Sequence, residues 1–554
     1  MLLHRAIAAA FALMPATTFA QAPDLIIHNA RIHTLDRENT GAQAVAVAQG
    51  RIVAVGANAD VLGRAGPATQ RSDAGGRTLL PGLIDAHIHV FPMGHNLKKV
   101  RTNDLRDLAA LLARLKAAAA ALPKGAWIEA ASDWHESQLK ENRFPTRWEL
   151  DAAAPEHPVF IRRGGHNVVI NSLAMRLAKI GERDPDPSGG HYDRSADGVF
   201  TGWILERPAI EPVAALLPKP SAADDLTAVQ AALRALNASG ITAVRDQHVS
   251  PADAATWYDL AQRGAATVRA HLILSVHPRR PAAQDFAMAE GLRRKLGPGG
   301  DFVRIGGLKI THDGGVEANL TSEDYANKAG YRGVAVTPVA KIREVSDWAC
   351  RNGWAMSVHT VGDVAIQNVL GAWEEIARAC PVAGKRWGLE HPYLLSAETI
   401  TRMKALGVIA HMQTPHHYTL GAGWVLYWGK ARADRSIPNR TLIDAGFEPT
   451  GGTDSPVTPY DAFLGMWSDV TRQTASAGVI GKREAVTPLE SLRMRTIWAA
   501  RGMQWEDRIG SIEPGKFADM VIVSDDPLTV DPDRLRDIKA IKTFVGGAIV
   551  YEAK

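Results

Sequence analysis

The sequence has 554 residues, 46% of them hydrophobic, and a formal net charge of +4. A chain of this length and ordinary composition buries large cores, so we expect two to four domains, or one large barrel with an accessory domain. Charges of both signs are mixed and no basic run is interleaved with aromatic residues. Nucleic-acid binding is therefore not indicated, and the expected partner is a small-molecule substrate.

Residues 1–20 have the pattern of a secretory signal peptide. His4 and Arg5 give a weakly basic start, residues 6–14 form a short apolar stretch, and small residues precede a cleavage site after Ala20. The alternative is a native helical or disordered N-terminus. The pattern predicts a periplasmic or secreted mature protein, with no membrane segment once the leader is removed.

Both ends of the remaining chain favour short β-strands. Candidates lie at residues 24–32, 44–48 and 51–56, and again at 519–523 and 541–550. The simplest arrangement is one β-sandwich domain built from residues 21–80 plus 510–554. The rest of the chain, residues 81–509, would then be inserted between its two halves.

Within residues 81–509, apolar strand candidates alternate with helical stretches. Eight such strands predict a (β/α)8 TIM barrel, with an open doubly wound sheet as the alternative. The candidates are Leu83–His89, Ile241–Asp246, Val268–Ser275, Val303–Ile310, Ala355–His359, Trp387–His391, Val408–Gln413 and Glu448–Asp454.

One connection is much longer than the others. Residues 90–240 follow the first barrel strand and include an Ala-rich helix over Leu108–Ala121. A segment this long must fold as an insertion, and it leaves from the carboxyl end of a barrel strand, where active sites of this fold lie. We expect it to be a lid or substrate subdomain.

Side chains that are candidates for a metal site recur at the carboxyl ends of the predicted strands. His87 and His89 share one face of the first strand, because residues i and i+2 point the same way. Further candidates follow on the fourth, fifth, sixth and eighth strands. The complete set is His87, His89, Lys309, His359, His391 and Asp454.

These residues lie in motifs that resemble the amidohydrolase superfamily of metal-dependent hydrolases. The matching stretches are Pro81–His89, Gly307–Lys309 with Asp313-Gly314, Val358–Asp363, Leu389–His391, Gly452–Pro456 and Gly510–Asp519. The chain looks most like the branch with a long insertion after the first strand, which includes N-substituted formamide deformylase-type enzymes. The resemblance implies a barrel with a β-sandwich and this strand-end ligand set.

Imidazole and carboxylate ligands suit zinc, and manganese or iron would also fit. A lysine ammonium cannot bind a cation, and the resemblance implies that Lys309 is carboxylated by CO2 and bridges two metals. The alternative is that Lys309 forms a salt bridge with Asp313, in which case the site would bind a single metal ion. In the two-metal case, Asp454 is both a ligand and the catalytic residue that moves a proton from metal-activated hydroxide to the leaving group.

Substrate contacts are less sharply indicated. His166 and Trp203 lie in the insertion, while Gln413 and His416 follow the seventh strand on the expected active-site face. Each also fits a packing or loop role. Whether Cys350 and Cys380 pair, and whether the protein forms a homo-oligomer, is left open by the sequence.

Three functions compete. The first is hydrolysis of a C–N bond in an amide, N-formyl or cyclic amide substrate. The second keeps the same site but cleaves a lactone or carboxyl ester. The third is a non-catalytic sensor on a hydrolase barrel, which the complete ligand set disfavours.

Overall fold

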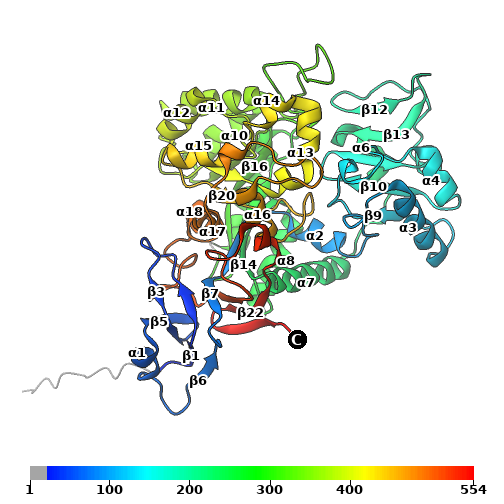
Figure 1. The fold of residues 1–554 in the computed structure, drawn as a ribbon. Coiled ribbons are helices and arrows are strands. Elements are labelled where there is room, and N and C mark those ends of the chain that lie inside the picture. The colour runs from blue at the N-terminus through cyan, green and yellow to red at the C-terminus, as the bar shows by residue number, and fades with distance from the viewer. Residues whose placement is uncertain (1–21, 298) are drawn as a thin grey trace, which may run out of the picture.

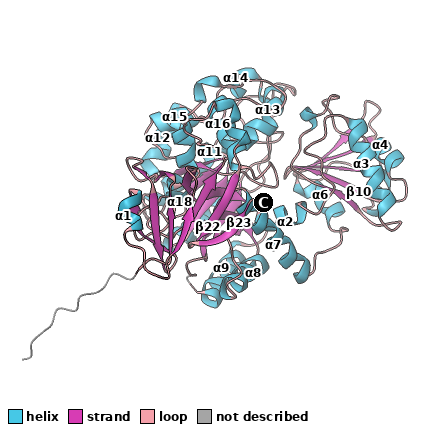
Figure 2. Cartoon of the chain, turned by 60° about the horizontal axis from the view of Figure 1, so that its bottom comes forward, coloured by secondary structure: helices cyan, strands magenta, loops and turns pink. Residues whose placement is uncertain are grey.

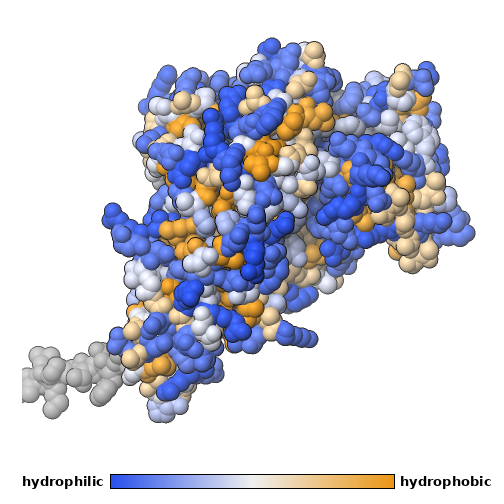
Figure 3. Space-filling view, in the orientation of Figure 1, coloured by the Kyte–Doolittle hydropathy of each residue, from blue (hydrophilic) through white to orange (hydrophobic). Residues whose placement is uncertain are grey.

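The computed structural model describes residues 22–297 and 299–554, so the predicted leader at residues 1–20 lies outside the described residues. Three parts are visible in Figure 1: a barrel in the middle, a sandwich at the lower left where blue and red strands meet, and the insertion at the right. Figure 2 shows the strands of the sandwich and those of the insertion as two separate groups. Hydrophobic residues on the face in Figure 3 form small groups among hydrophilic ones.

Both ends of the described chain build the sandwich. Strands from the C-terminal segment extend a sheet that residues 31–81 begin, and Met520 of β21 lies opposite Pro81 of β7 in an antiparallel pair. Ile27, Leu79 and Phe544 fill the core between the two sheets. The sheets contain β5-β4-β1-β6 (Arg51–Gly56, Ala44–Ala48, Leu25–His28, Gln70–Asp73) and β23-β22-β21-β7-β2-β3 (Ala548–Glu552, Ala540–Val545, Met520–Val523, Thr78–Pro81, Arg31–His33, Gly41–Ala42).

Eight parallel strands form the barrel in sequence order. They are β8 (Leu83–Ile88), β14 (Ile241–Val249), β15 (Arg269–Ser275), β16 (Val303–Thr311), β17 (Ala355–His359), β18 (Gly388–Glu390), β19 (Ile409–Met412) and β20 (Thr450–Gly451). Backbone hydrogen bonds join the carboxyl end of the first strand to the segment after the last one, from Asp454 N to His87 O (2.7 Å) and from His89 N to Ser455 O (2.9 Å). The predicted barrel is therefore confirmed, and the open sheet is excluded.

The eighth strand is shorter than predicted. Only Thr450 and Gly451 are strand, because the chain then turns, with Asp454 in the left-handed region at φ 58°. Gly452 makes this turn possible: a Cβ there would lie 2.5 Å from the backbone nitrogen of His87. The close approach brings the end of the barrel's last strand against its first.

The insertion has its own sheet, with the order β12-β13-β11-β10-β9. Successive residues of β10 face opposite sides, so Phe160 and Ile161 enter two different cores, each covered by helices. The strands are β9 (Ile128–Ala130), β10 (Val159–Arg163), β11 (Asn167–Ile170), β12 (His191–Arg194) and β13 (Phe200–Leu205), and the helices are α3 (Leu108–Ala121), α4 (Arg147–Ala153), α5 (Ser172–Leu177) and α6 (Arg207–Ala214).

The helices at the two ends of the segment 90–240 pack on each other beside the barrel. A Cβ on Gly94 of α2 (Val90–Asn96) would lie 2.2 Å from the Ala228 carbonyl oxygen of α7 (Ala222–Ala238), so the glycine permits their close contact. The independent sheet thus spans the residues between these two helices.

The outer helices of the barrel include α8 (Pro251–Gln262), α9 (Ala282–Leu296), α10 (Val339–Arg351), α11 (Asp363–Ala377), α12 (Ala397–Leu406), α13 (Pro415–Trp428) and α16 (Ala462–Thr471). A disulfide joins Cys350, in α10, to Cys380, just after α11, which answers the pairing question left open by the sequence. Among the described residues, none of the helices combines the length and apolar character that a bilayer crossing needs.

A buried ion pair joins the barrel to the sandwich. Arg269 of β15 donates to both carboxylate oxygens of Asp519, at 2.6 and 2.9 Å, and both side chains are almost fully buried. The guanidinium also lies over the ring of Phe517, 3.8 Å from its centre. Bidentate geometry and burial make this contact strong but intolerant of losing one partner.

We expect Arg269→Met to lower the free energy of unfolding by about 3–5 kcal/mol, because it leaves the Asp519 carboxylate buried without its counter-charge. The shift in the urea midpoint measures the effect. Adding Asp519→Leu should recover part of the loss, because it removes the stranded charge. As a control, Lys430→Gln in the exposed Lys430–Asp434 pair should change stability by less than about 1 kcal/mol. Equal effects of both single changes would contradict the proposed importance of the buried pair.

Candidate metal centre

The ligands predicted on the first and last barrel strands lie together where the barrel closes. His87 and His89 direct their Nε2 atoms at Asp454 Oδ1, at 3.2 and 2.9 Å. Asp454 itself comes from the turn after β20, and its carboxylate is buried. Two imidazoles and a carboxylate within this distance can hold a metal ion.

The histidines of the fifth and sixth strands complete the cluster. His359 ends β17 and His391 follows β18, and their ring centres lie 4.8 Å apart. His391 is also 4.6 Å from the His87 ring, and its Nε2 is 3.9 Å from Asp454 Oδ2. The structure thus brings together all five predicted histidine and aspartate ligands.

Lys309 projects from β16 into the same region. Its side chain is only 1% exposed, and among the described residues its amine has no hydrogen-bond partner. Asp313 does not pair with it, because that carboxylate accepts backbone N–H groups of Leu320, Val361 and Gly362 instead. A buried amine without partners is costly in an isolated chain, so its environment fits a bound group at this position.

Burial also sets the protonation of the ligands. It lowers the pKa of His87 and holds the pKa values of His359 and His391 well below the ordinary range, so the rings of His359 and His391 are neutral. Burial lowers the pKa of Lys309 to about 8, against the pull of the Glu390 and Asp454 carboxylates. Neutral imidazole is the form that binds metals, and the donor set therefore fits a divalent metal.

A carboxylate that the sequence reasoning did not single out orients His87. Glu390 ends β18 and is fully buried, with Oε2 2.6 Å from His87 Nδ1. Arg245 pairs with the other oxygen, and Ser357 donates to it at 2.7 Å. Although burial opposes it, the Arg245 guanidinium holds the pKa of Glu390 well below its usual value. Glu390 therefore stays ionised and fixes the His87 tautomer that leaves Nε2 free.

The ring of His89 is fixed in a different way. Its Nδ1 lies 3.0 Å from the Gln247 carbonyl oxygen, which leaves Nε2 toward Asp454. Although burial opposes it, the Asp454 carboxylate raises the pKa of His89. The two histidines of the first strand are thus held by one carboxylate and one backbone carbonyl.

Two predicted substrate residues, Gln413 and His416, lie beside the ligand cluster. His416 Nε2 is 3.0 Å from Asp454 Oδ2, and its Nδ1 is 2.9 Å from the Tyr393 hydroxyl. The same hydroxyl is 3.3 Å from Gln413 Oε1. With His391 and Asp454, His416 forms a second group that could hold a metal, so it contacts the centre itself.

The other two predicted substrate residues, His166 and Trp203, lie in the insertion. His166 Nδ1 is 2.9 Å from Glu206, and its ring lies 5.8 Å from that of His359. Although burial opposes it, the Glu206 carboxylate raises the pKa of His166 to about 9, so the ring is protonated at neutral pH. Trp203 lies farther out and donates to Asn167. Only His166 of this pair reaches the small cavity of about 50 Å³ that is lined by His359, His391 and Asp454.

Comparisons with known proteins agree with this geometry. A model of the amidohydrolase family matches residues 70–551. The N-substituted formamide deformylase of Arthrobacter pascens is 30% identical over 542 residues, covering 96% of this chain and 99% of that protein. The protein LONG AFTER FAR-RED 3 of Arabidopsis thaliana is 26% identical over 551 residues, covering 95% of this chain and 91% of that protein.

A solved structure shows the same architecture. The crystal structure of an uncharacterized metal-dependent hydrolase from Pyrococcus furiosus superimposes with a TM-score of 0.69 and 25% identity, covering 91% of this chain and all of that one. The chain therefore belongs to the amidohydrolase family and is a metal-dependent hydrolase that acts on carbon–nitrogen bonds.

Proposed function

We propose that the enzyme cleaves the C–N bond of an amide, N-formyl or cyclic amide substrate, with Asp454 as the residue that moves the proton. The observation that carries the proposal is the position of this carboxylate. It faces the cavity, in contact with His89 on one oxygen and His416 on the other. The full-length similarity to an N-substituted formamide deformylase supports the N-formyl class among these substrates.

The ligand set would suit two divalent ions, zinc being the first choice, and Lys309 would serve as a further ligand in the form of its carbamate. His87, His89 and Asp454 would hold one ion, and His359 and His391 the other. When bound, such ions lower the pKa of water and polarise a substrate carbonyl.

The chain's own groups then handle the proton. Although burial opposes it, His87, His416 and His89 hold the pKa of Asp454 well below its usual value, so the carboxylate is ionised and able to accept a proton. Oδ2, which His416 contacts, would take the proton from the attacking water and deliver it to the leaving nitrogen. The insertion covers this cavity with Gly164, Gly165 and His166, which limits access of bulk water.

The alternative left open by the sequence is hydrolysis of a lactone or carboxyl ester at the same site. Its leaving oxygen needs less help from a proton donor than an amine does. A panel of amides and esters with matched acyl groups separates the two functions, and a higher kcat/KM for the esters would overturn the amide proposal.

Asp454→Asn should lower kcat on the amide substrate by about 10²–10⁴-fold, because the side chain can no longer accept a proton. Steady-state kinetics on the metal-loaded enzyme measures the change. Asp253→Asn, a helix-capping carboxylate on α8 away from the cavity, is the matched control and should keep full turnover. An Asp454→Asn enzyme with undiminished kcat would rule out the proposed proton transfer.

Lys309→Met should reduce bound metal from about two equivalents per chain to about one, because the bridging ligand is lost. Elemental analysis after equilibration in bicarbonate buffer gives the stoichiometry. Lys341→Met, which removes a largely buried lysine paired with Asp285 outside the site, serves as the control. Two retained equivalents in Lys309→Met would favour a site that does not depend on the carbamate.

Glu390→Gln should weaken metal binding by about 10–100-fold, because it removes the acceptor that fixes the His87 ring. Competition with a chromogenic chelator measures this affinity without any substrate. Ser357→Ala also removes a contact to Glu390 but leaves the His87 contact intact, so it should change affinity much less. If the glutamine variant does not fold, Glu390→Asp keeps the charge beside Arg245 while withdrawing from His87. Unchanged affinity in a folded variant would show that Glu390 does not position this ligand.

A further inference from the structure

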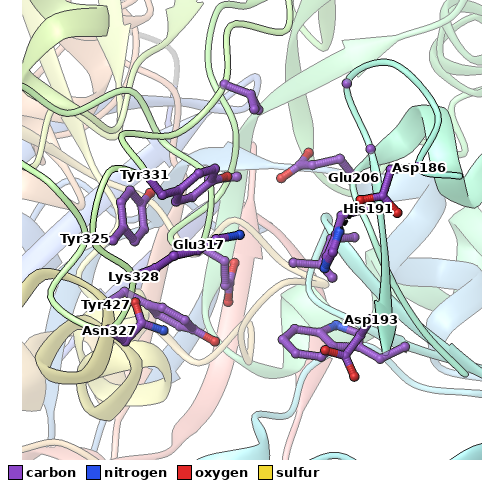
Figure 4. A pocket seen from close by; sticks show the side chains of 16 residues that line it. Asp186, His191, Asp193, Glu206, Glu317, Tyr325, Asn327, Lys328, Tyr331 and Tyr427 are labelled. Atoms are coloured by element: carbon purple, nitrogen blue, oxygen red, sulfur yellow. Dashed lines mark hydrogen bonds and ion pairs between the residues drawn. The ribbon is translucent and has the colours of Figure 1, made fainter. Parts of the chain in front are cut away.

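A second cavity of about 410 Å³ lies where the insertion meets the barrel (Figure 4). One wall comes from β12 and β13, together with the turn before β12 and Glu206 directly after β13. The other comes from the loop between β16 and α10 and from α13. This volume suits a small organic group, and two separate structural units enclose it.

The cavity adjoins the candidate metal centre. Glu317 lines both this cavity and the smaller one at the ligands. Glu206, on the opposite wall, is the residue that contacts His166, whose ring lies 5.8 Å from that of His359. A substrate with its scissile bond at the metal ligands can therefore extend a substituent toward this space.

Aromatic rings form much of the lining. Tyr325, Tyr331 and Tyr427 stand together on the barrel side of Figure 4, and Trp203 comes from β13 of the insertion. The Tyr331 ring already carries a cation, because the Lys328 ammonium lies 4.6 Å from its centre. An aromatic face that holds a lysine ammonium can hold a ligand ammonium in the same way.

The polar part of the lining is acidic. Four carboxylates, Asp186, Asp193, Glu206 and Glu317, face it, against the basic side chains of Lys328 and His191. Figure 4 shows the carboxylates of Glu206 and Glu317 directed into the space between the walls. An anionic substituent would be repelled here, and a cationic one attracted.

Two of these carboxylates are incompletely neutralised by the protein. Arg163 is shared between Glu317, at 2.6 Å, and Glu136, at 2.9 Å, so one guanidinium serves two buried carboxylates. Asp193 accepts a hydrogen bond from the Thr201 hydroxyl at 2.6 Å. Among the described residues, no basic nitrogen lies within 4.0 Å of the Asp193 carboxylate. The cavity wall thus retains negative charge for a ligand.

We propose that this cavity binds an organic ammonium group carried by the substrate, remote from the scissile bond, between the tyrosine rings and the carboxylates. The inference rests on the proposed function for the identity of the scissile bond, and it goes beyond it in naming the substituent. The substrate class is an amide whose amine portion bears a second, positively charged nitrogen.

The first test compares two N-formyl amines of equal length, one ending in trimethylammonium and the other in the isosteric, neutral tert-butyl group. We expect kcat/KM for the cationic compound to be at least about 10-fold higher, and the difference to shrink as salt is raised. Equal values for the two compounds, or a preference for the neutral one, would overturn the inference.

Charge changes at the cavity sharpen this test. Asp193→Asn should reduce the preference for the cationic compound by about 3–10-fold, because a carboxylate at the site is lost. Lys328→Gln should increase the preference, because a competing ammonium leaves the Tyr331 ring. Asp197→Asn is the matched control, since this exposed aspartate of the same insertion does not line the cavity. A similar shift from all three variants would point to a general field effect and contradict a site here.

A binding measurement separates this inference from the proposed function. Titration of the wild-type enzyme with the trimethylammonium amine, the expected product, should show binding that Asp193→Asn weakens. Binding of this amine without any amide hydrolysis would refute the proposed function and keep the ammonium site. Amide hydrolysis without binding or cationic preference would refute the ammonium site and keep the proposed function.

Discussion

The contact between Asp454 and the end of the first barrel strand is the constraint on which the centre depends. The Asp454 N–H donates to the His87 carbonyl, while its carboxylate lies between the imidazoles of His89 and His416. One residue thus closes the barrel with its backbone and joins the ligand groups with its side chain. The turn needs Gly452, because any Cβ there would collide with His87. Closure of the barrel and assembly of the site consequently depend on the same residue.

A second layer of buried charge holds this arrangement. Arg245 from β14 neutralises Glu390 from β18, and Glu390 in turn fixes His87 from β8. These strands lie in different parts of the barrel wall, so the contacts cross its interior. Ionised groups in a dry interior are stable only when each of them has its partner. The buried contacts inside the barrel therefore support the position of the metal ligands.

Much of the fold and of the ligand set could be predicted from the amino-acid sequence. Strands that alternate with helices specify the barrel, and placing side chains at the carboxyl ends of those strands points to His87, His359 and Asp454. Glu390 was harder to find, because it sits beside His391 in the same motif and its partner emerges only from the register between distant strands. The contact of His416 with Asp454 likewise depends on tertiary packing, because the Tyr393 hydroxyl holds the opposite side of the His416 ring. The large cavity has no sequence motif, because its walls come from two units whose relative placement is a tertiary property.

The sandwich has a consequence for how this protein reaches its native state. β7 leads directly into β8, yet its antiparallel partner is β21, so Pro81 lies opposite Met520 across most of the length of the chain. Until the last strands are made, the apolar Leu79 and Leu80 belong to an uncovered sheet edge, the kind of surface on which chains aggregate. Pairing over such a distance is also slow, because a very long loop must close first. The early strands of the nascent chain are therefore open to wrong pairing until the C-terminal segment has been made.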